Sequence, residues 1–598
     1  MDGGGAFAGV SRSLTGRKWT FAPVDERLAI ALSQRQSIPD IVGRVLAARG
    51  VGLDDAAEYL DPRLRSLLPD PGTLIDMDRA AARIVTAIRG GEQIAIFGDY
   101  DVDGATSSAL LQRFLTAVGG HVSVYIPDRV AEGYGPNTPA LQRLQREGAK
   151  VVITVDCGAT SYEPLAAAKA AGLDVLVIDH HAMEATTPDA HAVVNPNRLD
   201  ETCRHDLKLL AAVGVAFLLA IAVNRDLRDA GWYSKRSEPN LLDSLDIVAL
   251  GTVCDVVPLT GLNRALVAQG LKVLAGRRNA GIAALADVAK LDQKPAAWHL
   301  GFLLGPRVNA GGRVGESGLG TRLLSSDNAV EAADLAARLD AFNTERRMIE
   351  DEVLTQAIAQ VDEGRSFGKR VVIAAGEGWH PGVIGIVASR LKDRYNRPAC
   401  VIALENGEGK GSGRSMGGFD LGAAVIASRQ SGLLLAGGGH RMAAGFSVAQ
   451  SAIPEFSEFL DDRVDTLLDG QELVPELHLD GILRPSACQT DLVDALAMME
   501  PFGAGNPEPR FMLADVKIAY AKAVGQDQNH VSCRIQGQGG GPQISAIAFR
   551  AMESDIGPAL LGRRPGALHM AGRVRADWWN GERRVQLMID DVASSETA

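Results

Sequence analysis

The sequence predicts an α/β protein with a parallel-sheet domain, a long connecting helix, a second α/β domain and a C-terminal β-barrel. Three short apolar segments, Gln93–Phe97, Val151–Val155 and Val175–Ile178, alternate with Ala-rich helical stretches. Such segments are typical of a parallel sheet that is covered on both faces. Apolar side chains at helical spacing predict one helix over 343–362. Short alternating segments with turns over 477–598 favour a small β-barrel.

Length and composition describe an ordinary globular protein of several domains. The 598 residues correspond to roughly three to five domains. Hydrophobic residues make up 46% of the chain and charged residues 22%. The formal net charge of -12 is mild evidence against a nucleic-acid partner, because phosphate contacts need Lys and Arg. A metal site concentrates carboxylates, however, and a basic groove can lie on a protein that is acidic overall.

The cysteines and the N-terminus favour a cytoplasmic protein. None of the 6 cysteines belongs to a C-x-x-C pair, so the spacing predicts neither a disulfide framework nor a zinc site. Reduced thiols fit a cytoplasm best. The N-terminal segment has no apolar stretch of signal-peptide length, and no window approaches the ~18 apolar residues of a membrane span.

Further elements follow from composition and periodicity. Residues 1–20 are rich in Gly and Ser, and we expect them to be disordered in part. Two short helices are expected, one from about Pro39 and one after Asp54. The second α/β region is predicted as strand 371–375, helix 383–391 and strand 400–403, with Gly-rich loops at 407–418 and 436–445.

The most informative segment follows the first predicted strand. Asp99, Asp101 and Asp103 occupy alternate positions there, so on an extended backbone their carboxylates point the same way. Three like charges repel, and a bound divalent cation is the usual remedy. Gly104 permits a sharp turn into a helix whose N-terminus suits a phosphate.

Two simpler interpretations of this segment are a calcium loop and a solvated acidic turn. The D-x-D-x-D-G pattern resembles the start of an EF-hand loop. The twelfth loop position, however, is Leu110 and not Glu, and the pattern follows a predicted strand and not a helix. From this segment alone, three interpretations remain: a catalytic metal site, a calcium loop and a solvated acidic turn.

Further acids and histidines strengthen the metal interpretation. Asp156 ends the second predicted strand, Asp179, His180 and His181 end the third, and Asp255 lies isolated among apolar residues. An unpaired buried carboxylate is costly, and a metal ion would offset that cost. Carboxylates and imidazoles without Cys suit Mn²⁺ or Mg²⁺. The set exceeds what one ion takes, so it predicts two ions ~3.5–4 Å apart.

These elements resemble the DHH phosphoesterase superfamily and, within it, the RecJ family. The resemblance extends along nearly the whole chain through motifs in the family's order. These motifs are Gly305–Arg313, Leu339–Arg347, Gly378–Arg390, Gly411–Ser415, Gly437–Gly445 and Glu500–Pro509.

The resemblance implies a role for each residue of the acidic cluster. It implies metal ligation by Asp99, Asp101, Asp103, Asp156, His180 and Asp255, with Asp156 as a candidate bridge. Asp156, His180 and His181 are the implied catalytic residues, and His181 lines the site or contacts the scissile phosphate.

A second group of residues is implied in substrate binding. Ser412, Arg414 and His440 belong to Gly-rich segments that resemble the substrate-binding DHHA1 domain. Backbone N–H groups in such segments suit phosphate, and Arg binds it bidentately. For Arg307, Asn309 and Arg313 two roles stay open, contact with nucleic acid or joining of the domains.

The C-terminal segment resembles the family's OB-type domain, which binds single strands by a basic groove and stacking. Trp578 and Trp579 lie beside basic residues that suit such a groove, namely Arg573, Arg575, Arg583 and Arg584. The alternative is core packing for one Trp and a solvated charged face for the arginines.

The resulting organisation has five parts. We expect an N-terminal helical extension at 1–75, the DHH catalytic domain at 76–275, a helical connector at 276–362, DHHA1 at 363–468 and the OB-like domain at 469–598.

Two segments depart from the family's pattern. The run after Arg313 up to Gly320 is unusually rich in Gly, and the run Leu209–Gly214 is altered. We expect that neither segment touches a metal ligand.

The resemblance implies a single-stranded-DNA-specific 5′→3′ exonuclease. It would release 5′-mononucleotides by two-metal hydrolysis with Mn²⁺ or Mg²⁺ and act in DNA recombination and repair. Single-strand binding protein and a RecQ-type helicase are partners by the same resemblance. The alternatives are a nanoRNase or cyclic-dinucleotide phosphodiesterase, which usually lacks the C-terminal β region, a non-catalytic replication scaffold, which typically loses ligands, and a soluble pyrophosphatase.

Overall fold

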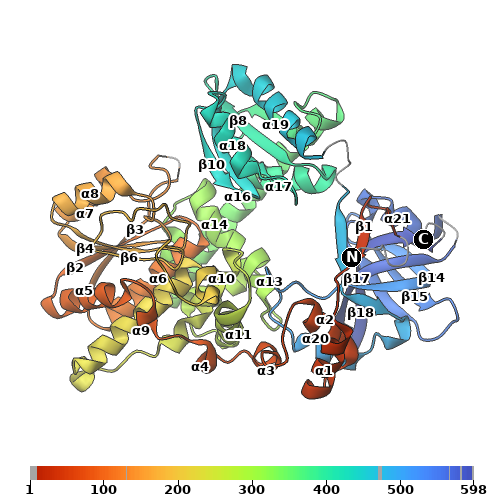
Figure 1. The fold of residues 1–598 in the computed structure, drawn as a ribbon, viewed down its shortest axis with the longest axis horizontal. Coiled ribbons are helices and arrows are strands. Elements are labelled where there is room, and N and C mark those ends of the chain that lie inside the picture. Colours follow the sequence, from red (N-terminus) through yellow and green to blue (C-terminus); the bar gives the residue numbers. More distant parts are fainter. Residues whose placement is uncertain (1–9, 130, 469–473, 564–565, 580–581, 596–598) are drawn as a thin grey trace. The chain divides into compact units, whose positions relative to one another are not determined.

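The computed structural model describes residues 10–129, 131–468, 474–563, 566–579 and 582–595 (Figure 1). Backbone contacts divide the chain into two compact units. One unit comprises Leu68–Leu473, and the other combines Met1–Leu67 with Val474–Ala598. No helix in the described part of the chain is long and apolar enough to span a membrane.

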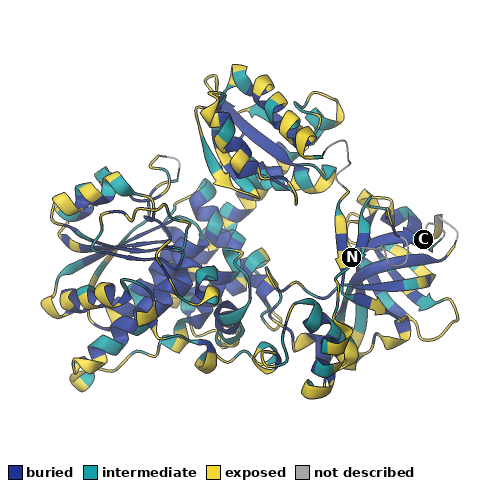
Figure 2. Cartoon of the chain, in the orientation of Figure 1, coloured by how far each residue is buried: buried dark blue, intermediate teal, exposed yellow. Residues whose placement is uncertain are grey.

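The first α/β domain is built on a fully parallel five-stranded sheet, which confirms the predicted fold class. The strand order is β3-β2-β4-β5-β6. The strands are β2 (Gln93–Gly98), β3 (His121–Tyr125), β4 (Ala149–Val155), β5 (Asp174–Ile178) and β6 (Ala192–Val194). The helices of this domain are α5 (Met77–Gly90), α6 (Val102–Ala117), α7 (Thr138–Arg146), α8 (Tyr162–Ala170) and α9 (Ala212–Asp229). Its central strands β2, β4 and β5 are buried beyond their first one or two residues, as their continuous apolar sequences require (Figure 2).

A run of helices follows and ends in one long helix. The helices are α10 (Leu245–Cys254), α11 (Gly261–Ala275), α12 (Ala280–Val288), α13 (Ala297–His299), α14 (Gly305–Val314), α15 (Leu319–Ser325) and α16 (Ala329–Asp362). The predicted helix over 343–362 is the C-terminal part of α16, which has 34 residues. Asn328 caps its start, because its side chain accepts hydrogen bonds from the backbone N–H groups of Val330 and Glu331.

The second α/β domain has a mixed sheet in the order β10-β11-β9-β8-β7. Its elements are β7 (Val372–Glu377), α17 (Ile384–Tyr395), β8 (Ala399–Glu405), β9 (Glu408–Arg414), α18 (Leu421–Gln430), β10 (Ala436–His440), β11 (Ala443–Ala449) and α19 (Ile453–Leu468). The prediction of Gly-rich loops was wrong, because those segments contain β9, β10 and the start of β11. At Gly411 a Cβ would lie 2.1 Å from the ring of Phe446, so a larger residue does not fit this strand.

The remaining unit joins both ends of the chain in one fold. The N-terminal elements are β1 (Lys18–Phe21), α1 (Glu26–Gln36), α2 (Asp40–Ala48), α3 (Ala56–Leu60) and α4 (Leu64–Leu67). The C-terminal elements are β12 (Glu476–Leu479), β13 (Gly481–Leu483), α20 (Thr490–Ala497), β14 (Phe511–Val524), β15 (His530–Gly537), β16 (Ile544–Ala548), α21 (Ile556–Pro558), β17 (Leu568–Trp579) and β18 (Glu582–Ser594). Pairing of β14 with both β15 and β17 closes a five-stranded OB-like barrel, as predicted.

The N-terminal segment contributes to the core of this unit. Strand β1 pairs in parallel with β12, so residues 18–20 form part of a sheet. Residues 1–9 lie outside the described part of the chain. Trp19 is fully buried, and its Nε1 donates to Asp591 Oδ2 of β18 at 2.9 Å. The domain boundaries expected from the sequence stay predictions.

Candidate metal centre

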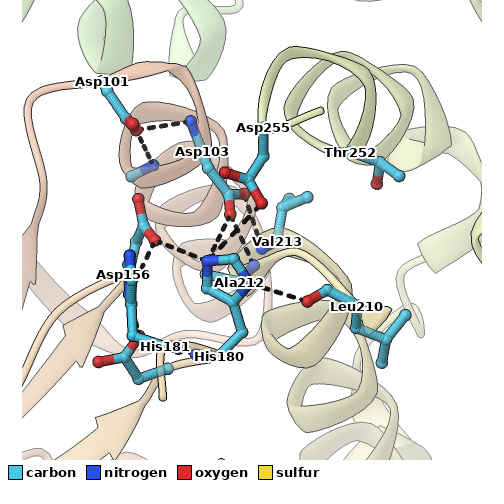
Figure 3. A network of polar contacts seen from close by, with 12 residues as sticks. Asp101, Asp103, Asp156, His180, His181, Leu210, Ala212, Val213, Thr252 and Asp255 are labelled. Carbon is cyan, nitrogen blue, oxygen red and sulfur yellow. Dashed lines mark hydrogen bonds and ion pairs between the residues drawn. The ribbon is translucent and has the colours of Figure 1, made fainter. Parts of the chain in front are cut away.

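The acids of the parallel sheet lie at the carboxyl ends of three neighbouring strands. Asp99, Asp156 and Asp179 directly follow β2, β4 and β5, which are adjacent in the sheet. In open α/β sheets, ligand sites lie beyond these strand ends. Figure 3 shows the side chains that meet there, including those of His180 and Asp255.

The predicted extended arrangement of the first three acids was wrong. Asp101 is the N-cap of α6, and its Oδ1 accepts hydrogen bonds from the backbone N–H groups of Asp103 and Gly104. Asp103 lies inside that helix, so its carboxylate turns away from the direction of strand β2. Asp99 and Asp101 therefore face Asp156, whereas Asp103 faces His180 and Asp255.

Asp103 is oriented by the first turn of α9. Its Oδ2 accepts the N–H of Ala212 at 2.6 Å, and its Oδ1 accepts the N–H of Val213 at 2.9 Å. His180 Nδ1 lies 2.9 Å from the carbonyl oxygen of Leu210 in the same segment. When Nδ1 of the neutral ring donates this hydrogen bond, Nε2 carries no proton. Its lone pair is then available to bind a metal ion. The expectation that Leu209–Gly214 touches no candidate ligand was therefore wrong.

Asp156 lies at the centre of the cluster. Its backbone adopts φ 61°, a left-handed conformation that is uncommon for a non-Gly residue. Its Oδ1 lies 3.4 Å from Nε2 of His180 and 3.8 Å from Nδ1 of His181. Nε2 of His180 also lies 3.7 Å from Asp255 Oδ2 and 3.9 Å from Asp103 Oδ2.

Asp179 orients the two histidines. Its Oδ1 accepts the backbone N–H of His180 at 2.7 Å and lies 2.8 Å from His181 Nδ1. Its Oδ2 accepts the N–H of Ala159 at 3.0 Å, and the residue is 1% exposed. With both oxygens engaged, Asp179 is a positioning residue for the imidazoles.

Among the described residues, the donor groups form three sets that Asp156 and His180 join, the third set being Asp156, His180 and His181. Asp99, Asp101 and Asp156 form one set, and Asp156 with His180 joins it to the set that contains Asp103 and Asp255. Among the described residues, the buried Asp99 Oδ1 and His180 Nε2 have no hydrogen-bond partner. Mixed carboxylate and imidazole donors with unsatisfied atoms fit a pair of Mn²⁺ or Mg²⁺ ions.

Burial and mutual repulsion raise the pKa of several carboxyls in the cluster. Burial, with repulsion from Asp101, raises the pKa of Asp99 to about 8 and that of Asp103 to about 7. Burial, with repulsion from Asp103, raises the pKa of Asp255 to about 9. Burial, with repulsion from Asp101, raises the pKa of Asp156 well above its ordinary value. These buried carboxyls are ionised together at neutral pH only when a cation compensates their charge.

The pKa values of the two imidazoles are shifted in opposite directions. Burial and the neighbouring His181 lower the pKa of His180, which favours the neutral ring that binds a metal. Burial alone would lower the pKa of His181, but the hydrogen bond and charge of Asp179 outweigh it and raise this pKa to about 9.

Several supporting residues were missed by the sequence analysis. The Tyr134 hydroxyl donates to the carbonyl oxygen of Asp156 at 2.9 Å, and its ring meets that of His181 edge-on at 5.9 Å. Asn195 and Asn197 donate to the carbonyl oxygens of His181 and His180, respectively. In the sequence these residues stand only in the short segments Val194–Asn197 and Gly133–Gly135. Neither segment indicates that its side chains contact Asp156 or the histidines.

Gly312, near the C-terminal end of α14, has a packing role. At Gly312 a Cβ would lie 2.7 Å from the carbonyl oxygen of Tyr100, which connects Asp99 to Asp101. The absence of a side chain at Gly312 thus lets α14 approach the acidic loop.

The six predicted substrate residues are in contrasting environments. Arg307 is buried and paired with Asp340 at 2.8 Å, which joins α14 to α16, and Asn309 lies half-buried on the same helix. Arg313 donates to the carbonyl oxygen of Gly382 at 2.8 Å. Burial, followed by the nearby cations of Arg129 and Arg346, lowers its pKa to about 10.

The DHHA1 residues gather at the end of β9. Arg414 Nη1 donates to Ser412 Oγ at 3.1 Å and to a backbone carbonyl oxygen, with no carboxylate partner among the described residues. Burial lowers its pKa. His440 is exposed at the end of β10, the edge strand. A half-buried guanidinium without an acid suits an anionic ligand.

The arginines that the sequence suggested for a groove on the C-terminal barrel are all paired: Arg573 with Asp590, Arg575 with Glu508, Arg583 with Asp494 and Arg584 with Glu582. The side chains of Trp578 and Trp579 lie outside what the structure describes.

Three family models match the chain, and they define a DHH-type protein. They are the DHH family N-terminal domain at residues 93–252, the DHHA1 domain at 368–466 and the RecJ OB domain at 479–591.

Relatives that match nearly the whole chain narrow this class. The single-stranded-DNA-specific exonuclease RecJ of Salmonella typhimurium is 36% identical over 93% of this chain and 96% of its own length. The RecJ of Bacillus subtilis is 33% identical over 97% of this chain and 71% of its own. The crystal structure of Thermus thermophilus RecJ with Mn²⁺ matches with TM-score 0.79 and 29% identity, covering 96% of this chain and 78% of that chain. The chain belongs to the RecJ family.

Proposed function

We propose that the chain is a single-stranded-DNA-specific exonuclease that degrades its substrate from the 5′ end and releases 5′-mononucleotides. The observation that carries this proposal is the convergence of Asp99, Asp101, Asp103, Asp156, His180 and Asp255 at one sheet edge. Relatives that cover nearly the whole chain are named single-stranded-DNA-specific exonucleases, and solved RecJ structures hold Mn²⁺ or Mg²⁺. The role in DNA recombination and repair follows from the same family.

The residues would divide the work as follows. Asp99 and Asp101 would hold one ion, Asp103, His180 and Asp255 the other, and Asp156 would lie between them. When bound, the ions activate water and neutralise charge on the phosphoryl group. His181 keeps Nδ1 against Asp179, so Nε2 is the nitrogen available to the scissile phosphate. Tyr134 holds the strained backbone of Asp156.

Substrate positioning falls to the DHHA1 residues and the adjacent α14. Arg313, Ser412, Arg414 and His440 would bind the 5′ end of the strand, since both arginines lack a carboxylate partner among the described residues. Asn309 lies on the same helix as Arg313 and is included in this proposal. For Arg307, the ion pair with Asp340 supports the joining role. Single-strand binding protein and a RecQ-type helicase, as partners, and a cytoplasmic location stay proposals.

The experiment replaces Asp156 with Ala and follows nucleotide release from 5′-labelled and 3′-labelled single and double strands with Mn²⁺. The wild-type chain should release labelled mononucleotides from 5′-labelled single strands first, and Asp156→Ala should be inactive. Asp287→Asn is the matched control, because Asp287 pairs with Arg277 outside the centre. Retained turnover in Asp156→Ala contradicts the assignment of the metal centre.

A further inference from the structure

Val256 has an unfavourable backbone conformation directly beside the metal centre. Helix α10 ends at Cys254, Asp255 is its C-cap, and Val256 follows with φ 61°. Of the non-glycine residues with positive φ in the described part of the chain, Val256 is the only one with a β-branched side chain. A β-branched side chain disfavours this left-handed region strongly, and Gly is the usual residue at this position after a helix.

The packing of the chain does not compensate this strain. Val256 is 70% exposed, and it is the only exposed residue of the run 251–260. Other residues anchor the loop, because Leu259 is buried and Asn263 Nδ2 donates to the carbonyl oxygen of Pro258 at 3.1 Å. Gly at position 256 would make the same turn without strain and without the loss of a core contact. The isopropyl group therefore serves a contact that the folded chain itself does not make.

The metal centre lies directly next to this side chain. The carboxylate of Asp255 belongs to the centre, and its Oδ2 lies 3.7 Å from Nε2 of His180 (Figure 3). Consecutive Cα atoms are ~3.8 Å apart, so Val256 borders the site at which the scissile phosphodiester would be held. An isopropyl group neither donates to a phosphate oxygen nor binds an ion. The parts of a DNA strand that it can contact are the uncharged ones, the sugar and the base.

Of these two parts, the sugar fits Val256 better. An exonuclease that removes nucleotides in turn has to accept every base, whereas the sugar is the same at each step. The sugars are also bonded directly to the scissile phosphate, and the bases extend away from it. A single fixed side chain at the edge of the centre therefore suits the sugar next to the scissile bond.

We propose that Val256 contacts the deoxyribose at the scissile bond and selects DNA over RNA. The inference rests on the proposed function and deepens it, because it names the side chain by which the centre recognises the sugar. A ribose 2′-hydroxyl placed against an isopropyl group loses its hydrogen bonds to water and gains none from the protein. Apolar contacts of this kind discriminate against an added hydroxyl by up to about a hundredfold. Deoxyribose carries only C–H bonds at that carbon and meets the side chain without such a loss.

The test compares Val256→Thr and Val256→Gly with the wild-type chain on two tetranucleotides, one deoxyribose and one ribose. A sequence of A and C alone makes the two substrates differ only at the 2′ carbon. Thr has the shape of Val and adds one hydroxyl, which can pair with the 2′-hydroxyl. In Val256→Thr the ratio of kcat/KM for DNA to that for RNA should fall about fivefold, the factor that one net hydrogen bond supplies. Val256→Gly removes the contact and should abolish most of the discrimination.

Thermal unfolding measures the strain independently of activity. Val256→Gly should raise Tm, because Gly adopts positive φ freely. Lys290→Gly is the matched control, because Lys290 is exposed and follows the C-cap of α12 with φ 55°. Its N–H donates three residues back to Asp287 at 3.0 Å, as that of Val256 does to Val253 at 3.2 Å. Lys290→Gly should also raise Tm but keep the wild-type DNA-to-RNA ratio, and an equal change of ratio in both Gly variants overturns the inference.

Longer strands with one ribonucleotide localise the contact through release of the first nucleotide. A ribonucleotide on one side of the first scissile bond should reproduce most of the loss in the wild-type chain, and one placed several nucleotides away should have no effect. An unchanged ratio in both Val256 variants, or equal cleavage of DNA and RNA by the wild type, overturns the role of Val256 and leaves the exonuclease intact. Cleavage of neither substrate refutes the proposed function. The ratio of Kd for the two tetranucleotides, measured by fluorescence anisotropy with a chelator, then still decides the sugar contact.

Discussion

Gly104 offers a sharp test of how the acidic loop is built. A Cβ at this position would lie 2.4 Å from the carbonyl oxygen of Asp99 and 2.7 Å from its Cα. Since these are backbone atoms, a rotamer change cannot relieve the overlap. Restoring a carbon–oxygen distance of ~3.2 Å needs a displacement of roughly 0.8 Å, and that displacement moves Asp99.

Gly104→Ala should therefore impair activity more than stability. A misplacement of ~1 Å at a reacting centre costs about a hundredfold in rate, or about 2.7 kcal/mol of transition-state stabilisation. Gly104 lies in the first turn of α6, where the higher helix propensity of Ala adds at most about 1 kcal/mol of stability and offsets part of the strain.

The assay compares kcat/KM for nucleotide release from a 5′-labelled single strand with the midpoint of thermal unfolding. Gly318→Ala is the matched control, because nothing lies within 4 Å of a Cβ at that position. It should behave as wild type in both measurements. A folded Gly104→Ala protein with wild-type kcat/KM would refute the argument that close backbone approach positions Asp99.

Three further predictions follow from single contacts. Tyr134→Phe removes the hydrogen bond to the Asp156 carbonyl oxygen; kcat/KM should fall about two- to tenfold at constant Tm, and an unchanged rate contradicts this role. Burial raises the pKa of Asp246 to about 6 from 3.8, so the folded state binds this proton more tightly and stability falls as pH rises through that interval. Between pH 4 and pH 7, the free energy of unfolding measured with urea should fall by on the order of 2 kcal/mol more in the wild type than in Asp246→Asn. The same pH dependence of unfolding free energy in both proteins would exclude this assignment. Trp19→Phe leaves the buried Asp591 carboxylate without its Nε1 donor; unfolding free energy of the barrel unit should drop by about 1–3 kcal/mol, and no loss would show that the contact is dispensable.

The sequence predicted the parallel sheet and the position of the acids along it. Apolar strands such as Val151–Val155 are recognisable because a doubly covered strand needs no polar positions. The residue after each strand must then lie at one edge, so Asp156 and Asp179 were expected near Asp99. The family motifs added the roles of His180 and Asp255, which periodicity does not provide.

The direction of each carboxylate was decided by backbone hydrogen bonds. Asp101 caps α6 while Asp103 is bound by the N–H groups of Ala212 and Val213, more than a hundred residues away. Backbone donors have no residue-specific signature, so the altered run Leu209–Gly214 gave no sign of its contact with the centre. The Gly-rich strands were missed for a related reason, because the ring of Phe446, and not local propensity, makes glycine necessary at Gly411.

The sequence by itself determined the chemical groups of this protein: which acids follow which strands, and which family the motifs resemble. Only the tertiary structure decided which charges remain available to a ligand. Arg583 is neutralised by Asp494, 89 positions away, whereas Lys522 and Arg534 meet no acid among the described residues. Ion pairing depends on distance in space, and residues far apart in the chain become neighbours only when the sheets and helices pack.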